Sequence, residues 1–203
     1  ASVCPIDALA PAAVSPPAVS VPLVDMLPPN APPSEALTES LTENTSNSTH
    51  RILNSAGLTV SGNVAMSVFA KKGERNWIRL TNNNIRGAFF DLENGVIGDV
   101  TSGVTVKMEN YGNGWYRCSI IQTGVANERL GIYTSIDGVN TTYQGDGTSG
   151  VYIFGAQLEQ QSYATSYIPT SGSTSTRNQE LRNNSGTVND FNSEEGVLYA
   201  EIA

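Results

Sequence analysis

Proline is concentrated at one end of this chain, where nine of the ten prolines lie within the first 33 residues. A proline fixes φ at about −65° and has no backbone N–H, so a segment this rich in proline forms neither a helix nor a central strand. We therefore expect residues 1–33 to form an extended, partly polyproline-like arm. Any globular domain must be built from the rest of the chain.

The arm differs from a typical flexible linker because valine and leucine fill the spaces between its prolines. We expect these apolar residues to lie on another surface, such as that of a neighbouring subunit, while the prolines reduce the entropy lost on docking. The alternative is a disordered spacer. The arm residues expected to bury apolar area are Val14, Val19, Val21, Leu23, Val24 and Leu27.

After residue 50 the chain alternates short apolar segments with turns rich in glycine and asparagine. This spacing predicts an all-β fold, and about nine strands suit a two-sheet antiparallel sandwich. A tight hairpin is expected at Glu93-Asn94-Gly95. The predicted strands are residues 64–70, 77–80, 88–92, 96–100, 105–110, 115–122, 130–135 and 151–159, preceded by one or two short strands within residues 52–62.

The predicted domain spans residues 51–177 and lies between two polar segments. Residues 34–50 form a connector in which Ser34 could cap a short helical turn through Leu41. Residues 178–203 contain a linker and then EEGVLYAEIA, which alternates like the first strand of a following domain. Because a strand without a partner is not stable, we expect this chain to be part of a longer polypeptide.

The formal net charge is −8 and only 15% of the residues are charged, so uncharged polar side chains supply most of the polar surface. This composition is typical of extracellular, viral or fibrous β-proteins. The basic residues are scattered rather than clustered, which argues against a nucleic-acid-binding role. No run of about 18 apolar residues occurs, so no membrane-spanning helix is expected.

The two cysteines, Cys4 and Cys118, are too few to form a disulfide framework. We expect Cys118, in a predicted strand, to be a buried free thiol. Cys4 is expected to be exposed or to pair with another chain, and a disulfide between Cys4 and Cys118 is the alternative.

Four segments occur in one order along the chain: SVFAKKGERNWIRL, AFFDLENGVIG, YGNGWYRCSI and GDGTSGVYIFGAQLEQQSYATSYIPTSGSTSTR. Together they resemble a jelly-roll domain of phage virion structural and tail-fibre proteins, which is itself similar to a carbohydrate-binding module. The resemblance covers residues 50–177 and implies a jelly-roll sandwich. In that family a second, concanavalin-like sandwich often follows.

Glycan binding is one function that the resemblance implies. Exposed aromatic rings stack on sugar rings, and neighbouring polar side chains form hydrogen bonds with sugar hydroxyls. Trp115 and Tyr116 are adjacent, so on a strand they must face opposite sides. The alternative is that these aromatic residues are structural. The candidate glycan-binding residues are Trp77, Trp115, Tyr116 and Tyr143.

We do not expect an enzyme. The single histidine, His50, lies in a polar segment, and the chain has no GxSxG motif or indicated pair of catalytic carboxylates. No cofactor or metal site is expected either. Structural calcium is the alternative, and Asp137, Asp146 and Glu159 could offer oxygen ligands without the spacing of an EF-hand.

The sequence therefore favours a virion structural protein, such as a fibre, spike or decoration subunit, located in a virion or outside the cell. Its expected partners are other virion subunits in a homo-oligomer and a surface glycan, but neither nucleic acid nor membrane. The alternative is a glycan-binding module of an extracellular polysaccharide-active protein.

Overall fold

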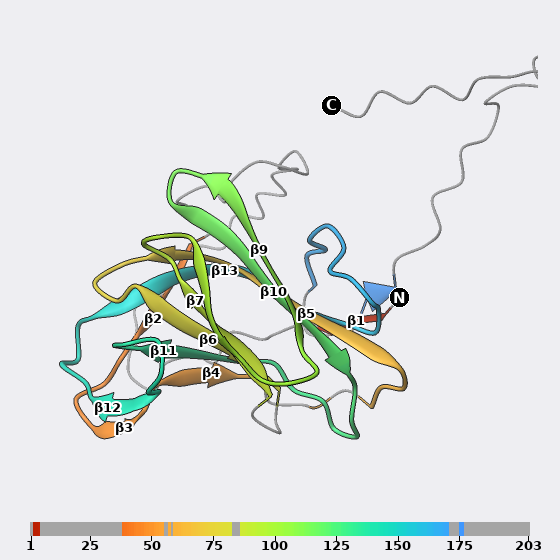
Figure 1. The fold of residues 1–203 in the computed structure, drawn as a ribbon, viewed down its shortest axis with the longest axis horizontal. Helices are drawn as coiled ribbons and strands as arrows, with labels where there is room; N and C mark the ends of the chain where they lie inside the picture. The colour runs from red at the N-terminus through yellow and green to blue at the C-terminus, as the bar shows by residue number, and fades with distance from the viewer. Residues whose placement is uncertain are drawn as a thin grey trace, which may run out of the picture.

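The computed structural model describes residues 2–4, 38–54, 57, 59–82, 86–170 and 175–176, with the backbone alone for residues 2–4 and 175. Figure 1 shows two sheets stacked on one another, and the strand pairings are antiparallel. The predicted all-β, two-sheet antiparallel jelly-roll sandwich is thus confirmed. The predictions for the arm residues named above, for Ser34 and for residues 178–203 lie outside the described residues.

The sandwich consists of one seven-stranded and one five-stranded sheet, with a small two-stranded sheet at one end. The seven-stranded sheet contains, in spatial order, β14 (Ser175–Thr176), β1 (Ser2–Cys4), β13 (Gly150–Glu159), β5 (Asn63–Lys72), β10 (Trp115–Thr123) and β9 (Thr105–Gly112), and β2 (Glu39–Thr42) also pairs with β13. The five-stranded sheet contains β4 (Arg51–Leu53), β11 (Gly131–Ser135), β6 (Trp77–Thr81), β7 (Gly87–Asp91) and β8 (Val96–Val100). The two-stranded sheet contains β3 (Asn47–Thr49) and β12 (Thr142–Gln144).

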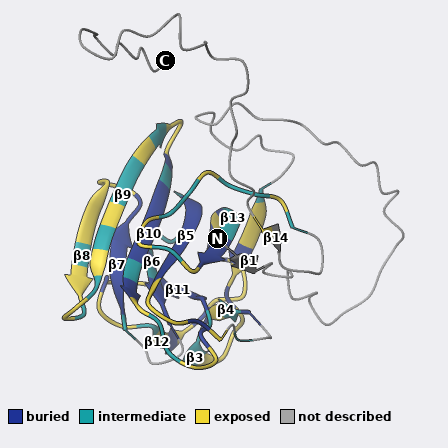
Figure 2. Cartoon of the chain, turned by 90° about the vertical axis from the view of Figure 1, so that its right-hand side faces the viewer, coloured by how far each residue is buried: buried dark blue, intermediate teal, exposed yellow. Residues whose placement is uncertain are grey.

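The hydrophobic core lies between the two large sheets and follows from the alternation of side chains along each strand. Every second residue of β5 faces inward with no solvent exposure: Val64, Met66, Val68 and Ala70. The five-stranded sheet supplies the opposite half of the core, including Ile78, Leu80, Ala88, Phe90 and Ile132. Figure 2 shows buried residues in the central strands and exposed residues along β8 and β9 at one side of the sandwich.

Cys118 lies in this core on β10 and is a buried, free cysteine, as predicted. Burial raises the pKa of its thiol, because an apolar environment disfavours the thiolate. The side chain of Cys4 lies outside the described residues.

The strands predicted between residues 64 and 159 are present with small shifts at their ends. For example, β5 and β9 each end two residues later than predicted, at Lys72 and Gly112. The expected Glu93-Asn94-Gly95 hairpin is also present, because these residues form the turn between β7 and β8. Local alternation and turn chemistry were sufficient to find these elements.

The short helical turn through Leu41 was a wrong prediction. Leu41 instead lies in β2, pairs with Val151 of β13 and is 6% exposed. Two further strands, β3 and β12, were not predicted, and Thr49 and Thr142 share a hydroxyl hydrogen bond of 2.9 Å across them. The sandwich therefore includes strands before residue 51, and their partners are remote in sequence, which local periodicity does not reveal. The prediction that residues 1–33 contain no central strand was also wrong for Ser2–Cys4, because β1 lies before the first proline and pairs with β13 on one side and β14 on the other.

We predict that Phe90→Ala lowers the free energy of unfolding by about 3–5 kcal/mol, because it removes a fully buried ring and leaves a cavity. Urea denaturation followed by intrinsic fluorescence measures this change. Val96→Ala is the control, since Val96 is 52% exposed and the loss there should stay below about 1 kcal/mol. Equal losses for the two variants would contradict the assignment of Phe90 to the core.

Candidate functional site

The outer face of the five-stranded sheet carries alternating arginine and aromatic side chains, which we call the Arg–aromatic row. In register order the row is formed by Arg51, Tyr133, Arg79 and Phe89. The Arg51 guanidinium lies 5.5 Å from the centre of the Tyr133 ring and donates a 2.9 Å hydrogen bond to its hydroxyl. The Arg79 guanidinium lies 5.1 Å from the centre of the Phe89 ring. These cation–π contacts hold both guanidinium groups against the sheet.

An open hollow of about 260 Å³ adjoins this row. Its lining residues are Arg79, Gly87, Phe89, Asp99, Val100 and Thr101. Burial lowers the pKa of Arg79, and the nearby Tyr133 partly opposes that shift; an arginine still remains charged at neutral pH. The hollow therefore presents a cation, a carboxylate and a hydroxyl, while the Phe89 ring in its wall is 6% exposed and lies under the Arg79 guanidinium. Such a set can form charge-assisted hydrogen bonds with the polar groups of a sugar.

Trp77 lies on the same face in the neighbouring row, opposite Asp91 and Ser135, and is half-buried. Two glycines approach its indole closely. A Cβ added to Gly98 or to Gly138 would lie 2.8 Å from ring atoms of Trp77, so a larger residue would displace the indole. The indole is thus fixed by its surroundings on the outer face.

The structure does not bring the four predicted glycan-binding residues onto one surface. Trp115 lies on the outer face of the seven-stranded sheet and is 4% exposed. Tyr116 faces the opposite way, as expected for adjacent strand residues, and packs against the core. Tyr143 is buried at the end of the sandwich that carries β12. Trp77 alone shares a face with the hollow.

Arg79, Phe89 and Asp99 are not among the residues predicted from the sequence. A signal for two of them exists, because alternation in WIRL and AFFDL places Arg79 and Phe89 on one outward face once Leu80 and Phe90 face inward. The pairing of these two strands is what brings the guanidinium over the ring. Asp99 had no comparable local signal.

The outer face of the seven-stranded sheet is partly covered, at β13 and at Arg117 of β10, by the chain that follows β13. The carboxylate of Glu159 is buried and accepts hydrogen bonds from the backbone N–H of Thr165, at 3.0 Å, and from its hydroxyl. Arg117 donates a hydrogen bond to the Thr165 carbonyl, and the Ile168 N–H donates one to Gln157 at 2.9 Å. Arg117, Gln157 and Glu159 therefore bind the backbone of the same chain.

A buried ion pair explains the position of Tyr143. Arg75 donates two hydrogen bonds, of 2.9 and 2.6 Å, to the carboxylate of Glu43, which is 3% exposed. The Tyr143 hydroxyl donates a third bond at 2.8 Å and the Asp146 N–H a fourth at 2.9 Å. The hydrogen bond from Arg75 is the largest cause of a lowered pKa at Glu43. The ring of His50 is also buried, and its centre lies 4.7 Å from that of Tyr143.

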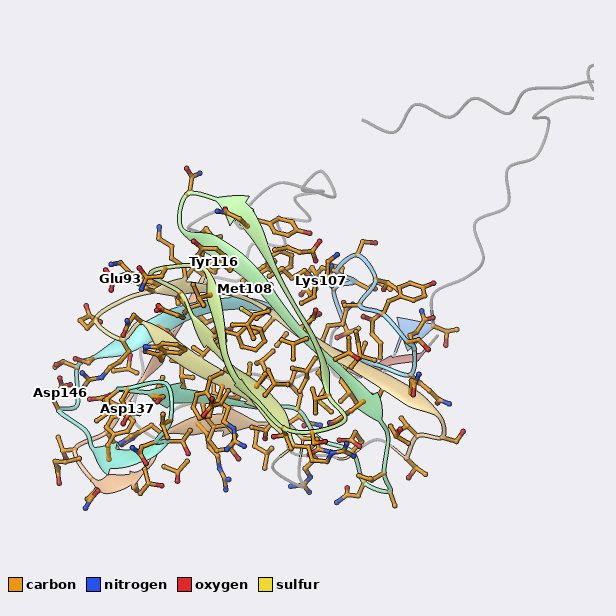
Figure 3. All side chains as sticks on the ribbon, viewed as in Figure 1. Glu93, Lys107, Met108, Tyr116, Asp137 and Asp146 are labelled. Atoms are coloured by element: carbon orange, nitrogen blue, oxygen red, sulfur yellow. The ribbon has the colours of Figure 1, made fainter. Side chains whose placement is uncertain are left out.

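The three carboxylates considered for calcium lie in separate places and serve local structure. Asp137 accepts hydrogen bonds from the Val139 and Asn140 N–H groups, and those bonds lower its pKa to about 2, with Asn140 as the largest cause. Asp146 accepts bonds from Ser149, which lower its pKa in the same way. Figure 3 shows Asp137 and Asp146 in loops at one end of the sandwich. Among the described residues no cluster of three potential metal-ligating His, Cys, Asp or Glu side chains occurs.

No protein-family model fits this chain, and no curated protein is significantly similar to it. Within the described ranges, no helix is long and apolar enough to cross a membrane. The candidate site therefore rests on the geometry of the Arg–aromatic row and its hollow.

We predict that Arg75→Met destabilises the fold by about 3 kcal/mol at pH 7, because the Glu43 carboxylate remains buried without its partner. The folded-state pKa of Glu43 lies below its usual 4.5, so its stabilising contribution is complete above that pH and is lost as pH falls through the lowered value. Urea denaturation between pH 7 and pH 3 should show a weaker loss of stability towards acid pH in Arg75→Met than in the parent.

The matched control is Lys72→Met, which breaks the exposed pair between Lys72 and Glu93, with side chains 46% and 49% exposed. That change should cost less than about 1 kcal/mol. A cost for Arg75→Met no greater than for this control would show that the buried pair contributes little to stability.

Proposed function

We propose that this chain is a structural subunit of a virion, of the fibre, spike or decoration kind, held in its assembly by the N-terminal arm. The observation that supports this proposal is the use of the N-terminal residues as a strand. β1 pairs with β13 through Val3 and Cys4, and with β14 through Ser2 and Val3. Residues 5–37 separate β1 from the next described segment.

A strand on a tether of that length need not pair within its own subunit. Fully extended, residues 5–37 can span on the order of 100 Å, because each residue adds about 3.3 Å. The same pairing with β13 is then available to β1 of a neighbouring copy, and exchange of identical elements is a common route to oligomers. The valines and leucines of the arm would bury apolar area against the neighbour, in agreement with the resemblance to phage structural proteins.

We predict that replacing Val14, Val19, Val21, Leu23, Val24 and Leu27 together with serine abolishes incorporation of the chain into its native assembly, while the sandwich stays folded. β1 is left intact in this variant, so the loss would be attributable to the apolar arm residues. Electron microscopy and sedimentation of the assembly measure incorporation, and circular dichroism checks the fold. Normal incorporation of this variant, and of a deletion of residues 1–33, would refute the assembly role of the arm.

A second candidate function is glycan binding, either as part of virion attachment or in a module of a polysaccharide-active protein. The hollow beside the Arg–aromatic row favours it, because Arg79, Asp99 and Thr101 line the hollow and offer charged and polar hydrogen-bonding groups. Trp77 adds an aromatic side chain on the same face.

We predict that a glycan array detects binding by the full chain, and that Arg79→Met and Asp99→Asn each weaken it about ten-fold or more through loss of charge-assisted hydrogen bonds. Tyr163→Ala is the control, because Tyr163 is an aromatic residue 61% exposed in the segment after β13. If Tyr163→Ala weakens glycan binding and Arg79→Met does not, the glycan site lies outside the hollow. An array without any binding would remove the glycan function and leave the assembly role untouched.

A further inference from the structure

β9 is a long strand at the edge of the seven-stranded sheet. It runs from Thr105 to Gly112 and, within the described part of the chain, pairs only with β10. Its pairing with β10 is regular from Thr105 to Asn110, and the one register shift lies opposite Trp115 and Tyr116. A regular edge of this length can pair with a further strand, and sheets normally avoid such contacts by bulges, prolines or unbalanced charges.

The charges on β9 are balanced and close together. The Lys107 ammonium lies 2.7 Å from the Glu109 carboxylate, and their side chains are 63% and 37% exposed. Both face outward from the sandwich, because the inward positions on either side of them are Val106 and Met108. A lone lysine on an edge strand repels a second copy of itself, but a lysine and a glutamate two residues apart need not.

An antiparallel copy of β9 centred on Met108 would be complementary at its charged positions. In that register Lys107 faces Glu109 of the second copy, and Glu109 faces its Lys107. Tyr111 lies at the register shift of β9 and packs edge-to-face on Phe69, so the charge pairs, and not a Thr105–Tyr111 pair, define this register. The two-fold symmetry generates both charge pairs at once, as in any isologous interface. A partner strand of unrelated sequence would have to supply the same charges in the reverse order.

Apolar residues next to this edge would be covered by the same contact. β8 lies beside β9 (Figure 2), and its Ile97 and Val100 are 38% and 43% exposed. Met108 and Val106 pack only partly against the core at the open side of the sandwich. Figure 3 labels Met108 on β9 and Tyr116 on the neighbouring strand β10, and both belong to this half-covered side of the core.

We infer that β9 pairs with β9 of a second copy of this chain across a two-fold axis at Met108, so that two seven-stranded sheets join into one continuous sheet. This surface is separate from the N-terminal arm, since β1 and β9 lie at different sides of the sheet with β13, β5 and β10 between them. The inference therefore goes beyond the proposed function and can be tested independently of it.

Charge reversal tests the register directly. In the Lys107→Glu variant, positions 107 and 109 are both glutamate, so glutamate faces glutamate across the axis. In the Glu109→Lys variant both positions are lysine, so lysine faces lysine. Each variant alone should dimerise at least roughly ten-fold more weakly than the parent chain. A 1:1 mixture of the two variants should form a heterodimer at the same concentrations at which the parent chain dimerises, because every facing pair then has opposite charge. The double variant K107E/E109K should form a homodimer again for the same reason.

Sedimentation velocity of the full-length chains over a concentration series measures these equilibria. Glu39→Lys is the matched control: it makes the same change of charge as Glu109→Lys at an exposed position on β2 and should leave dimerisation unchanged. The serine variant of the arm is measured in parallel. A monomeric parent, or dimers that resist both single charge reversals, would overturn the inference. So would dimers lost in the arm variant and retained in the β9 variants, although that result would support the proposed function.

Discussion

Strand β5 is hydrogen-bonded to β10 on one side and to β13 on the other along most of its length. Its inward residues are fully buried, and its outward residues include Ser67 and Lys71. A slip of one residue would exchange these two sets, since side chains alternate with a period of two. The register of β5 therefore determines what the core contains and which side chains appear on the outer face.

The buried pair of Glu43 and Arg75 controls a different part of the molecule. It joins residues between β2 and β3 to the turn after β5, while Tyr143 links β12 to the same carboxylate. Short strands such as β3 and β12 have too few backbone hydrogen bonds to hold their position alone. A charge removed from water requires this full set of hydrogen bonds, which explains why several loops converge on one carboxylate.

The two outer faces of the sandwich differ in what they offer to a ligand. The outer face of the seven-stranded sheet is partly covered by the chain after β13, which Arg117, Gln157 and Glu159 hold through its backbone. On the five-stranded sheet the hollow lined by Arg79 and Asp99 is open, while Tyr133 and Phe89 of the Arg–aromatic row are buried. The proposed glycan binding therefore concerns the five-stranded sheet, and the proposed assembly contacts concern β9 and the N-terminal arm.

The sequence by itself determined the strands of the main sandwich, the burial of Cys118 and the opposite orientation of Trp115 and Tyr116. These follow from local alternation and from proline and glycine chemistry, which act over a few residues. Only the tertiary structure decided that Leu41 lies in a strand, that Tyr143 is buried against Glu43, 100 positions away, and that Arg79 covers Phe89. Those outcomes depend on which strands pair and in which register. They are set by the packing of distant segments around one core rather than by the residues adjacent in the chain.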